Sequence, residues 1–423
     1  MKNLFKINPG LLLFTALALA LILANSPWGN AYAHFWEQVI AIRISDFTLS
    51  KTLHEWINDA LMSIFFFNIG LEVKKEVTGG QFSDLKMAML PVGAAIGGMI
   101  FPAVIFLFFN YNTPNMNAWA IPVATDIAVV LAVLAIFGKN IPSVAVAFMA
   151  MLAVIDDLGS TGIIALFYSH DIEWTNVLIA LGFFLIMLVL NKMRVRDLWA
   201  YGAIGTLGLW FAIMLSGIHA TVGAVLAAVA IPGRPEINKS RFVGRLRKLV
   251  NGYRKTKEIP GPYVSEKQEN ILEELDELSY KADTPVQKLH YLFTPVVNYM
   301  ILPIFALCNG GIVIGEVSVL EMQSPFVLGI ATGLFIGKMA GIFLVARLMV
   351  FFKIAQFPDG MNAKHLFAMS LFGGVGFTMS IFIAGLAVQD IHEISVAKTA
   401  VFFGSGLSVL FGVLYLKFLG KES

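Results

Sequence analysis

Long apolar runs separated by short polar segments are the feature that most constrains this chain. About 20 apolar residues cross the hydrocarbon core of a bilayer as a helix, and a helix satisfies its own backbone hydrogen bonds there. Two further runs, 218–232 and 294–312, are short and interrupted by Gly and Pro. They add to ten clear runs, which cover roughly 10–25, 58–76, 87–110, 119–138, 143–168, 174–191, 198–216, 326–350, 365–388 and 396–418. The sequence therefore predicts an all-α polytopic membrane protein with about 12 transmembrane helices.

The composition agrees with a membrane protein and excludes several other classes. Of the 423 residues, 57% are hydrophobic and only 14% are charged, whereas soluble domains are about 25% charged. A formal net charge of +2 gives no sign of a nucleic-acid partner. The one cysteine, Cys308, excludes a disulfide framework, a thiolate zinc site and an iron–sulfur cluster. That count leaves a haem or quinone site open. For the chain as a whole we expect no cofactor and no enzymatic activity.

The positions of Lys and Arg predict the orientation of the spans. They gather near alternate ends of the apolar runs, and the opposite loops near 111–118, 169–173, 309–325 and 389–395 contain none. Because positively charged loops stay on the cytoplasmic side, we predict that both termini are cytoplasmic.

The first span has an alternative interpretation as a cleavable signal peptide. Lys2 and Lys6 precede the apolar stretch and Ala31-Tyr32-Ala33 follows it, which resembles a secretory signal with its cleavage site. Cleavage would leave eleven spans and an external N-terminus, but every later loop would keep its side.

Two segments outside the spans have recognisable patterns. Residues 40–50 alternate apolar and other residues and predict a short external β-hairpin, either a dimer contact or a connector lying on the membrane. Residues 233–287 form a polar cytoplasmic loop whose first half is basic, which would favour an anionic leaflet. Its second half is acidic, and a capping box at Ser265 predicts a helix there. This loop is either a solvated helical hairpin or a site of regulation.

Four charged residues fall deep inside the spans: Asp126, Asp156, Asp157 and Lys338. Such a charge costs roughly 2.5–3.5 kcal/mol on insertion scales, so each one needs a partner, a wet cavity or a function. Adjacent carboxylates on a helix point about 100° apart, so Asp156 and Asp157 can border one cavity. Their oxygens can hold either a hard cation or protons, and competition between the two is an exchange mechanism. A simple buried salt bridge with Lys338 is the alternative interpretation.

Two spans, the fourth and the eleventh, contain helix-breaking residues at corresponding places. These are Ile121–Asp126 and Gly373–Ser380. Paired discontinuous helices are typical of midplane ion sites in inverted-repeat transporters. Where half-helices meet, their positive N-terminal ends and negative C-terminal ends need opposite charges. We therefore expect Asp126 to compensate the N-terminal ends and Lys338 the C-terminal ends.

Six short motifs, spread over nearly the whole chain, closely resemble the NhaA family of bacterial sodium/proton antiporters. They are GLEVKKE at 70–76, AAIGGM at 94–99, AIP and ATDIA at 120–128, IDDLG at 155–159, SGIHAT at 216–221 and GFTMSIFI at 376–383. The resemblance implies an inner-membrane, twelve-helix protein with inverted repeats and two crossed discontinuous helices. It also implies electrogenic export of sodium or lithium in exchange for protons, by a homodimer that associates through an external hairpin.

The resemblance also assigns roles to particular residues. It implies that Asp156 and Asp157 bind Na+ or Li+ and protons, that Lys338 pairs with Asp156, and that Thr125 and Asp126 belong to the broken span beside them. A cytoplasm-facing cluster that responds to pH would comprise Glu72, Lys75, Glu76 and His219. For this cluster a helix-end ion network, and for His219 a buried structural histidine, are the alternatives.

The chain departs from the family pattern at His290, after Lys338, and in the loop 233–287, which is expanded relative to compact members of the family. Where the family pattern leads us to expect a regulatory glutamate before the ninth span, this sequence has His290, and Lys338 is followed by Met-Ala-Gly instead of Pro-Leu-Gly. The first departure bears on pH regulation and leaves the transport site intact.

Three other functions fit parts of the pattern. A cation channel also needs intramembrane acids, but it does not need a lysine beside them. A subunit of a larger complex is disfavoured because the chain carries a complete site of its own. A sodium-coupled symporter shares the broken helices, but no pocket for an organic anion is evident beyond the half-helix ends.

Overall fold

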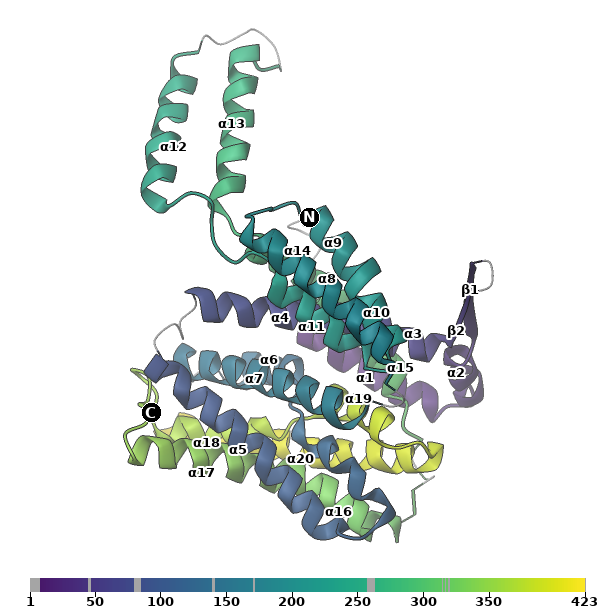
Figure 1. The fold of residues 1–423 in the computed structure, drawn as a ribbon. Coiled ribbons are helices and arrows are strands. Elements are labelled where there is room, and N and C mark those ends of the chain that lie inside the picture. The colour runs from purple at the N-terminus through teal and green to yellow at the C-terminus, as the bar shows by residue number, and fades with distance from the viewer. Residues whose placement is uncertain are drawn as a thin grey trace.

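The computed structural model of the chain is almost entirely helical (Figure 1). It describes residues 8–422 except 45–46, 80–84, 139–140, 170–171, 257–262, 314, 316 and 319. In the first half the elements are α1 (Pro9–Ala24), α2 (Gly29–Trp36), β1 (Val39–Ile44), β2 (Phe47–Thr52), α3 (Leu53–Trp56), η1 (Ile57–Leu61), α4 (Met62–Gly79), α5 (Leu85–Asn110), η2 (Pro114–Val123), α6 (Ile127–Phe137), α7 (Ser143–Phe167), α8 (Trp174–Lys192), α9 (Leu198–Ala203), η3 (Ile204–Trp210) and α10 (Phe211–Leu215).

The second half continues in the same style. Its elements are α11 (Ala220–Ala230), α12 (Lys239–Arg254), α13 (Glu266–Ala282), α14 (Pro285–Val296), η4 (Val297–Ile301), α15 (Leu302–Asn309), η5 (Glu321–Gln323), α16 (Pro325–Thr332), η6 (Gly333–Gly337), α17 (Lys338–Phe351), α18 (Ala363–Gly373), α19 (Phe377–Ala387) and α20 (Ile391–Glu422). Several short elements join into longer rods through π-helical turns; one such rod runs from α16 through η6 into α17.

Helix length and hydropathy support a polytopic membrane protein. Among the described residues, seven helices are long and apolar enough to cross a bilayer, or up to ten if each of three bent helix pairs counts as one span. α11 is apolar but shorter than a full span. The architecture is therefore the predicted class, while the number of twelve spans stays a prediction.

Two of the bent pairs are the spans in which the sequence predicts breaks. η2 and α6 meet at a bend of 43°, and α18 and α19 also meet at 43°. The first break begins at Ala124, whose extended backbone (ψ 150°) ends the 3-10 turn after Pro122. The second break lies between Gly373, the last residue of α18, and Phe377, the first residue of α19, and it contains Gly374 and Gly376. Each break exposes main-chain groups in the middle of the fold, and these groups need partners there.

Small residues let the helices around the breaks approach closely. A Cβ atom added to Gly341 on α17 would lie 2.1 Å from the main-chain oxygen of Gly97 on α5, and one on Gly97 would lie 2.4 Å from the oxygen of Gly341. The two backbones are thus in direct contact, which is the typical interface between helices in a membrane. This contact positions the start of α17, where Lys338 lies.

Two hairpins stand apart from the helical body (Figure 1). β1 and β2 pair antiparallel, with Val39 opposite Thr52 and Ile44 opposite Phe47. α12 and α13 form a helical hairpin within the polar loop. α13 begins at a capping box, in which Ser265 N donates to Gln268 Oε1 at 2.8 Å and Gln268 N donates to Ser265 Oγ at 3.3 Å.

Candidate functional site

Adjacent carboxylates on α7 form the centre of the candidate site. Asp156 and Asp157 both have 0% of their surface exposed. The Nζ atom of Lys338, also 0% exposed, donates to Oδ2 of Asp156 at 2.5 Å. Asp156 and Lys338 are 182 positions apart in the sequence. They come into contact because α5 packs on both α7 and the α16–α17 rod.

Four buried oxygen atoms in one turn of α7 have no hydrogen-bond partner among the described residues. They are Oδ1 of Asp156, both carboxylate oxygens of Asp157 and Oγ of Ser160. Buried polar atoms are normally paired, so an unpaired group calls for an explanation such as a ligand. Carboxylate and hydroxyl oxygens are the ligands that hard cations prefer, and the same carboxylates can bind protons. The arrangement is chemically suited to a monovalent cation or to protons.

The first break, at residues 124–126, meets the second break through direct hydrogen bonds. Asp126 N donates to the main-chain oxygen of Val375 at 2.6 Å, and Thr125 Oγ1 donates to that of Gly373 at 2.9 Å. The carboxylate of Asp126 accepts from Val129 N at 3.1 Å, and from the main-chain N–H (3.0 Å) and hydroxyl of Thr378. This one carboxylate therefore caps the N-terminal ends of both α6 and α19, where helix dipoles place positive charge.

Lys338 contacts Asp156, as the family resemblance implies, and its compensation of the helix C-terminal ends stays a prediction. Within the part of the chain that the structure describes, its hydrogen bond goes to Asp156, and none goes to the carbonyl groups at the ends of η2 or α18. Electrostatic interactions connect Asp157 with Asp156, Asp126, Lys338 and Glu72. The four predicted intramembrane charges thus form one cluster, with Glu72 at its edge.

Three of the residues implied in pH response lie together on α4. Glu72 interacts electrostatically with Lys75 and Glu76. His290, on α14, lies beside Asn68 and interacts with Lys75. His290, where the family pattern predicts a glutamate, therefore lies next to the α4 residues, because α14 packs against α4.

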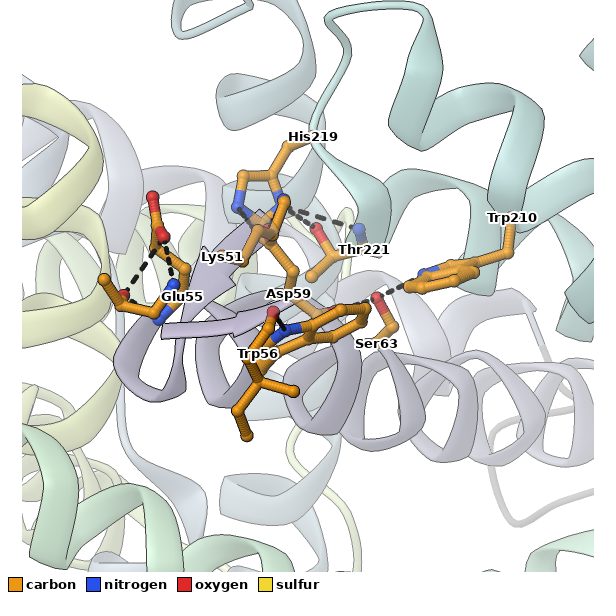
Figure 2. Close-up of polar contacts among 10 residues, drawn as sticks. Lys51, Glu55, Trp56, Asp59, Ser63, Trp210, His219 and Thr221 are labelled. Carbon is orange, nitrogen blue, oxygen red and sulfur yellow. Dashed lines mark hydrogen bonds and ion pairs between the residues drawn. The ribbon is translucent and has the colours of Figure 1, made fainter. Parts of the chain in front are cut away.

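His219 lies away from that group. Figure 2 shows it beside Asp59 of η1, with Nε2 of the histidine 3.7 Å from Oδ1 of the carboxylate. Lys51 of β2 pairs with the same carboxylate, and Nδ1 of His219 lies 2.9 Å from the hydroxyl of Thr221. Ser63 completes the network: its hydroxyl donates to the main-chain oxygen of Asp59 at 2.5 Å and accepts from Trp210 Nε1 at 2.7 Å.

The direction of α11 explains this separation. α11 packs against α4 with Gly70 beside Ala228, so its first residue reaches back to the start of α4. Asp59 and Glu72 are 13 positions apart on a nearly continuous helix, which is about 20 Å. The implied cluster of four residues is thus split: Glu72, Lys75 and Glu76 lie at one end and His219 at the other.

The sequence analysis singled out neither Ser160 beside the carboxylates nor Lys51, Asp59, Ser63 and Trp210 around His219. Ser160 carries a signal in hindsight, since it follows the aspartates by one helical turn. Lys51 and Asp59 carry little local signal, because their pairing depends on how the hairpin folds back on η1.

Comparisons with known proteins identify relatives of the chain along nearly its whole length. The family described as "Na+/H+ antiporter 1" matches residues 5–416. The Na(+)/H(+) antiporter NhaA of Helicobacter pylori is 39% identical and matches 100% of this chain and 96% of its own length. The NhaA 2 antiporter of Syntrophotalea carbinolica is also 39% identical, over 94% of this chain and 91% of its own. That of Oleidesulfovibrio alaskensis is 36% identical over 98% and 93%.

Proposed function

Since the chain belongs to the Na+/H+ antiporter 1 family, we propose that it exports Na+ or Li+ in electrogenic exchange for protons, by alternating access, across a bacterial inner membrane. The observation that carries the proposal is the set of unpaired, fully buried carboxylate oxygens on Asp156 and Asp157 beside two hydrogen-bonded helix breaks. A charged group in such a place is normally functional.

In this proposal the two carboxylates bind either the cation or protons, and the two occupants compete. Lys338 holds Asp156 by its 2.5 Å hydrogen bond when the cation is absent. Asp126 and Thr125 keep the two breaks together and so fix the half-helices around the site. Alternating access then moves this unit relative to its surroundings, in an inverted repeat with crossed broken helices and both termini cytoplasmic.

We also propose a homodimer and a pH response. Val39 (62% exposed) and Ile40 (47% exposed) on β1 offer apolar surface to a second copy. For the pH response, we take Glu72, Lys75 and Glu76 with His290 as one unit, because Glu72 and His290 both interact electrostatically with Lys75. His219 would act separately, through Asp59 and the base of the hairpin.

The test is sodium-induced movement of protons in proteoliposomes that contain the purified chain and an internal pH dye. We expect a response to Na+ and Li+ but not to K+, and we expect the response to Na+ and Li+ to rise between about pH 6.5 and pH 9. A potassium response of equal size would favour a channel. Absence of any response from folded protein would refute antiport and favour a symporter.

The variant Asp157→Asn separates transport from folding. It removes one exchangeable charge and leaves the side-chain volume unchanged, so we expect loss of sodium-driven proton movement in a protein with normal helix content. Thr399→Val, which removes a hydroxyl bonded within α20, is the matched control. Normal exchange by Asp157→Asn would exclude Asp157 from the site.

A further inference from the structure

Ser160 has an unexplained hydroxyl next to the carboxylates on α7. The residue is only 1% exposed, and its Oγ has no hydrogen-bond partner among the described residues. In a helix, a serine or threonine hydroxyl usually bonds to the main-chain oxygen one turn earlier. Thr161, the next residue, does so: its Oγ1 donates to the main-chain oxygen of Asp157 at 2.8 Å. The hydroxyl of Ser160 does not use this option.

The helix geometry places Ser160 between the two carboxylates. At 100° per residue, Ser160 projects about 40° from the direction of Asp156 and about 60° from that of Asp157, on the arc that separates them. Its Cα lies about 6 Å along the axis from that of Asp156 and about 4.5 Å from that of Asp157. Residues three and four apart are neighbours on a helix surface, so the three side chains border one space.

The unpaired atoms around that space all carry oxygen lone pairs. Lys338 accounts for one carboxylate oxygen of Asp156, and the three remaining carboxylate oxygens lie with Ser160 Oγ in a single helical turn. Hard cations bind such oxygens at about 2.3–2.6 Å, so one ion reaches ligands about 5 Å apart. A hydroxyl also keeps its lone pairs when the carboxylates gain protons, so its contribution to cation binding is independent of their charge.

We propose that the Ser160 hydroxyl is a direct ligand of the transported cation, completing the coordination that Asp156 and Asp157 begin. This inference rests on the proposed function and extends it from the charged groups to a neutral oxygen that sets cation affinity. Removal of the hydroxyl weakens cation binding, because one ligand is lost. The number of exchanged protons stays unchanged, because the hydroxyl neither gains nor loses a proton.

The test compares Ser160→Ala with Thr161→Val in the full-length protein. Alanine is smaller than serine and favours helix, so the variant folds, and its unfolding temperature without sodium verifies this. We expect the sodium concentration for half-maximal exchange to rise about tenfold or more, since an interaction with a charged partner is lost. We expect the maximal rate to stay within about twofold, as when uniform binding is removed. Thr161→Val should change the half-maximal concentration by less than about twofold.

A binding measurement gives a second readout that does not depend on turnover. Calorimetric titration of the detergent-solubilised protein with NaCl should show the same tenfold loss of affinity in Ser160→Ala. Wild-type affinity in Ser160→Ala, or an equal loss in Thr161→Val, would overturn the assignment of Ser160 while leaving antiport intact. If the unmodified chain neither binds sodium nor exchanges it, the proposed function fails, and the assignment of Ser160 fails with it.

Discussion

Replacing Lys338 by methionine tests whether its contact with Asp156 holds the transmembrane helices together. Both side chains are fully buried and share a 2.5 Å hydrogen bond, so the variant leaves a buried carboxylate without its cation. Removing one partner of a buried ion pair typically costs about 3–5 kcal/mol, because the remaining charge is uncompensated. Methionine keeps the apolar stem of lysine, so little of this loss comes from a cavity. We therefore expect a destabilisation of that size.

The assay is thermal unfolding in detergent, followed by circular dichroism, for three variants. Lys338→Met should unfold several degrees below the unmodified protein, and Lys255→Met, at an exposed position after α12, should not. The double variant Asp156→Asn/Lys338→Met should be more stable than Lys338→Met alone, since it contains no unpaired charge. Equal unfolding temperatures for Lys338→Met and the unmodified protein would refute the structural role of the pair.

Two further predictions concern other parts of the molecule. Gly341→Val forces a side chain into the backbone of Gly97, 2.1 Å away, and should destabilise the protein by about 1–3 kcal/mol or more. The control Gly182→Val on α8, with no atom within 4 Å of its added Cβ, should leave the stability unchanged. Equal unfolding temperatures for the two variants would contradict the close contact of α5 and α17. In the loop before α16, hydrogen bonds from His392 and Ser318 lower the pKa of Glu321 to about 2. Since a lowered pKa stabilises the folded contact above the ordinary glutamate value of about 4.3, this contact should persist there and be lost as the pH falls through about 2. NMR titration of the Glu321 carboxyl should show this value and its return toward 4.3 in His392→Gln; an unchanged pKa in that variant would exclude the contact.

The site illustrates both the reach and the limit of sequence reasoning. Asp126, Asp156, Asp157 and Lys338 were predictable because an ionisable residue in an apolar span is costly wherever the span packs. The family resemblance implied that Lys338 pairs with Asp156, and the structure contains this hydrogen bond. The bonds by which Asp126 caps both α6 and α19 were not predictable, because they require the positions of separate helices, which local sequence does not contain.

The split of the implied pH-response group has the same origin. Glu72, Lys75 and Glu76 are neighbours by helical spacing alone, which the sequence predicts. His219 joins Asp59 instead, because Gly70 packs beside Ala228 and thereby sets the height of α11 along α4.

The apolar helices, the two interrupted spans and the charges inside the membrane follow from the amino-acid sequence, because bilayer thickness and the cost of burying charge act on each segment separately. Tertiary structure alone decided that the breaks bond to each other, that His219 pairs at the hairpin end, and that the Ser160 hydroxyl stays unpaired beside the carboxylates. Those outcomes depend on contacts between residues far apart in the chain, which exist only once small residues have brought the helix backbones together.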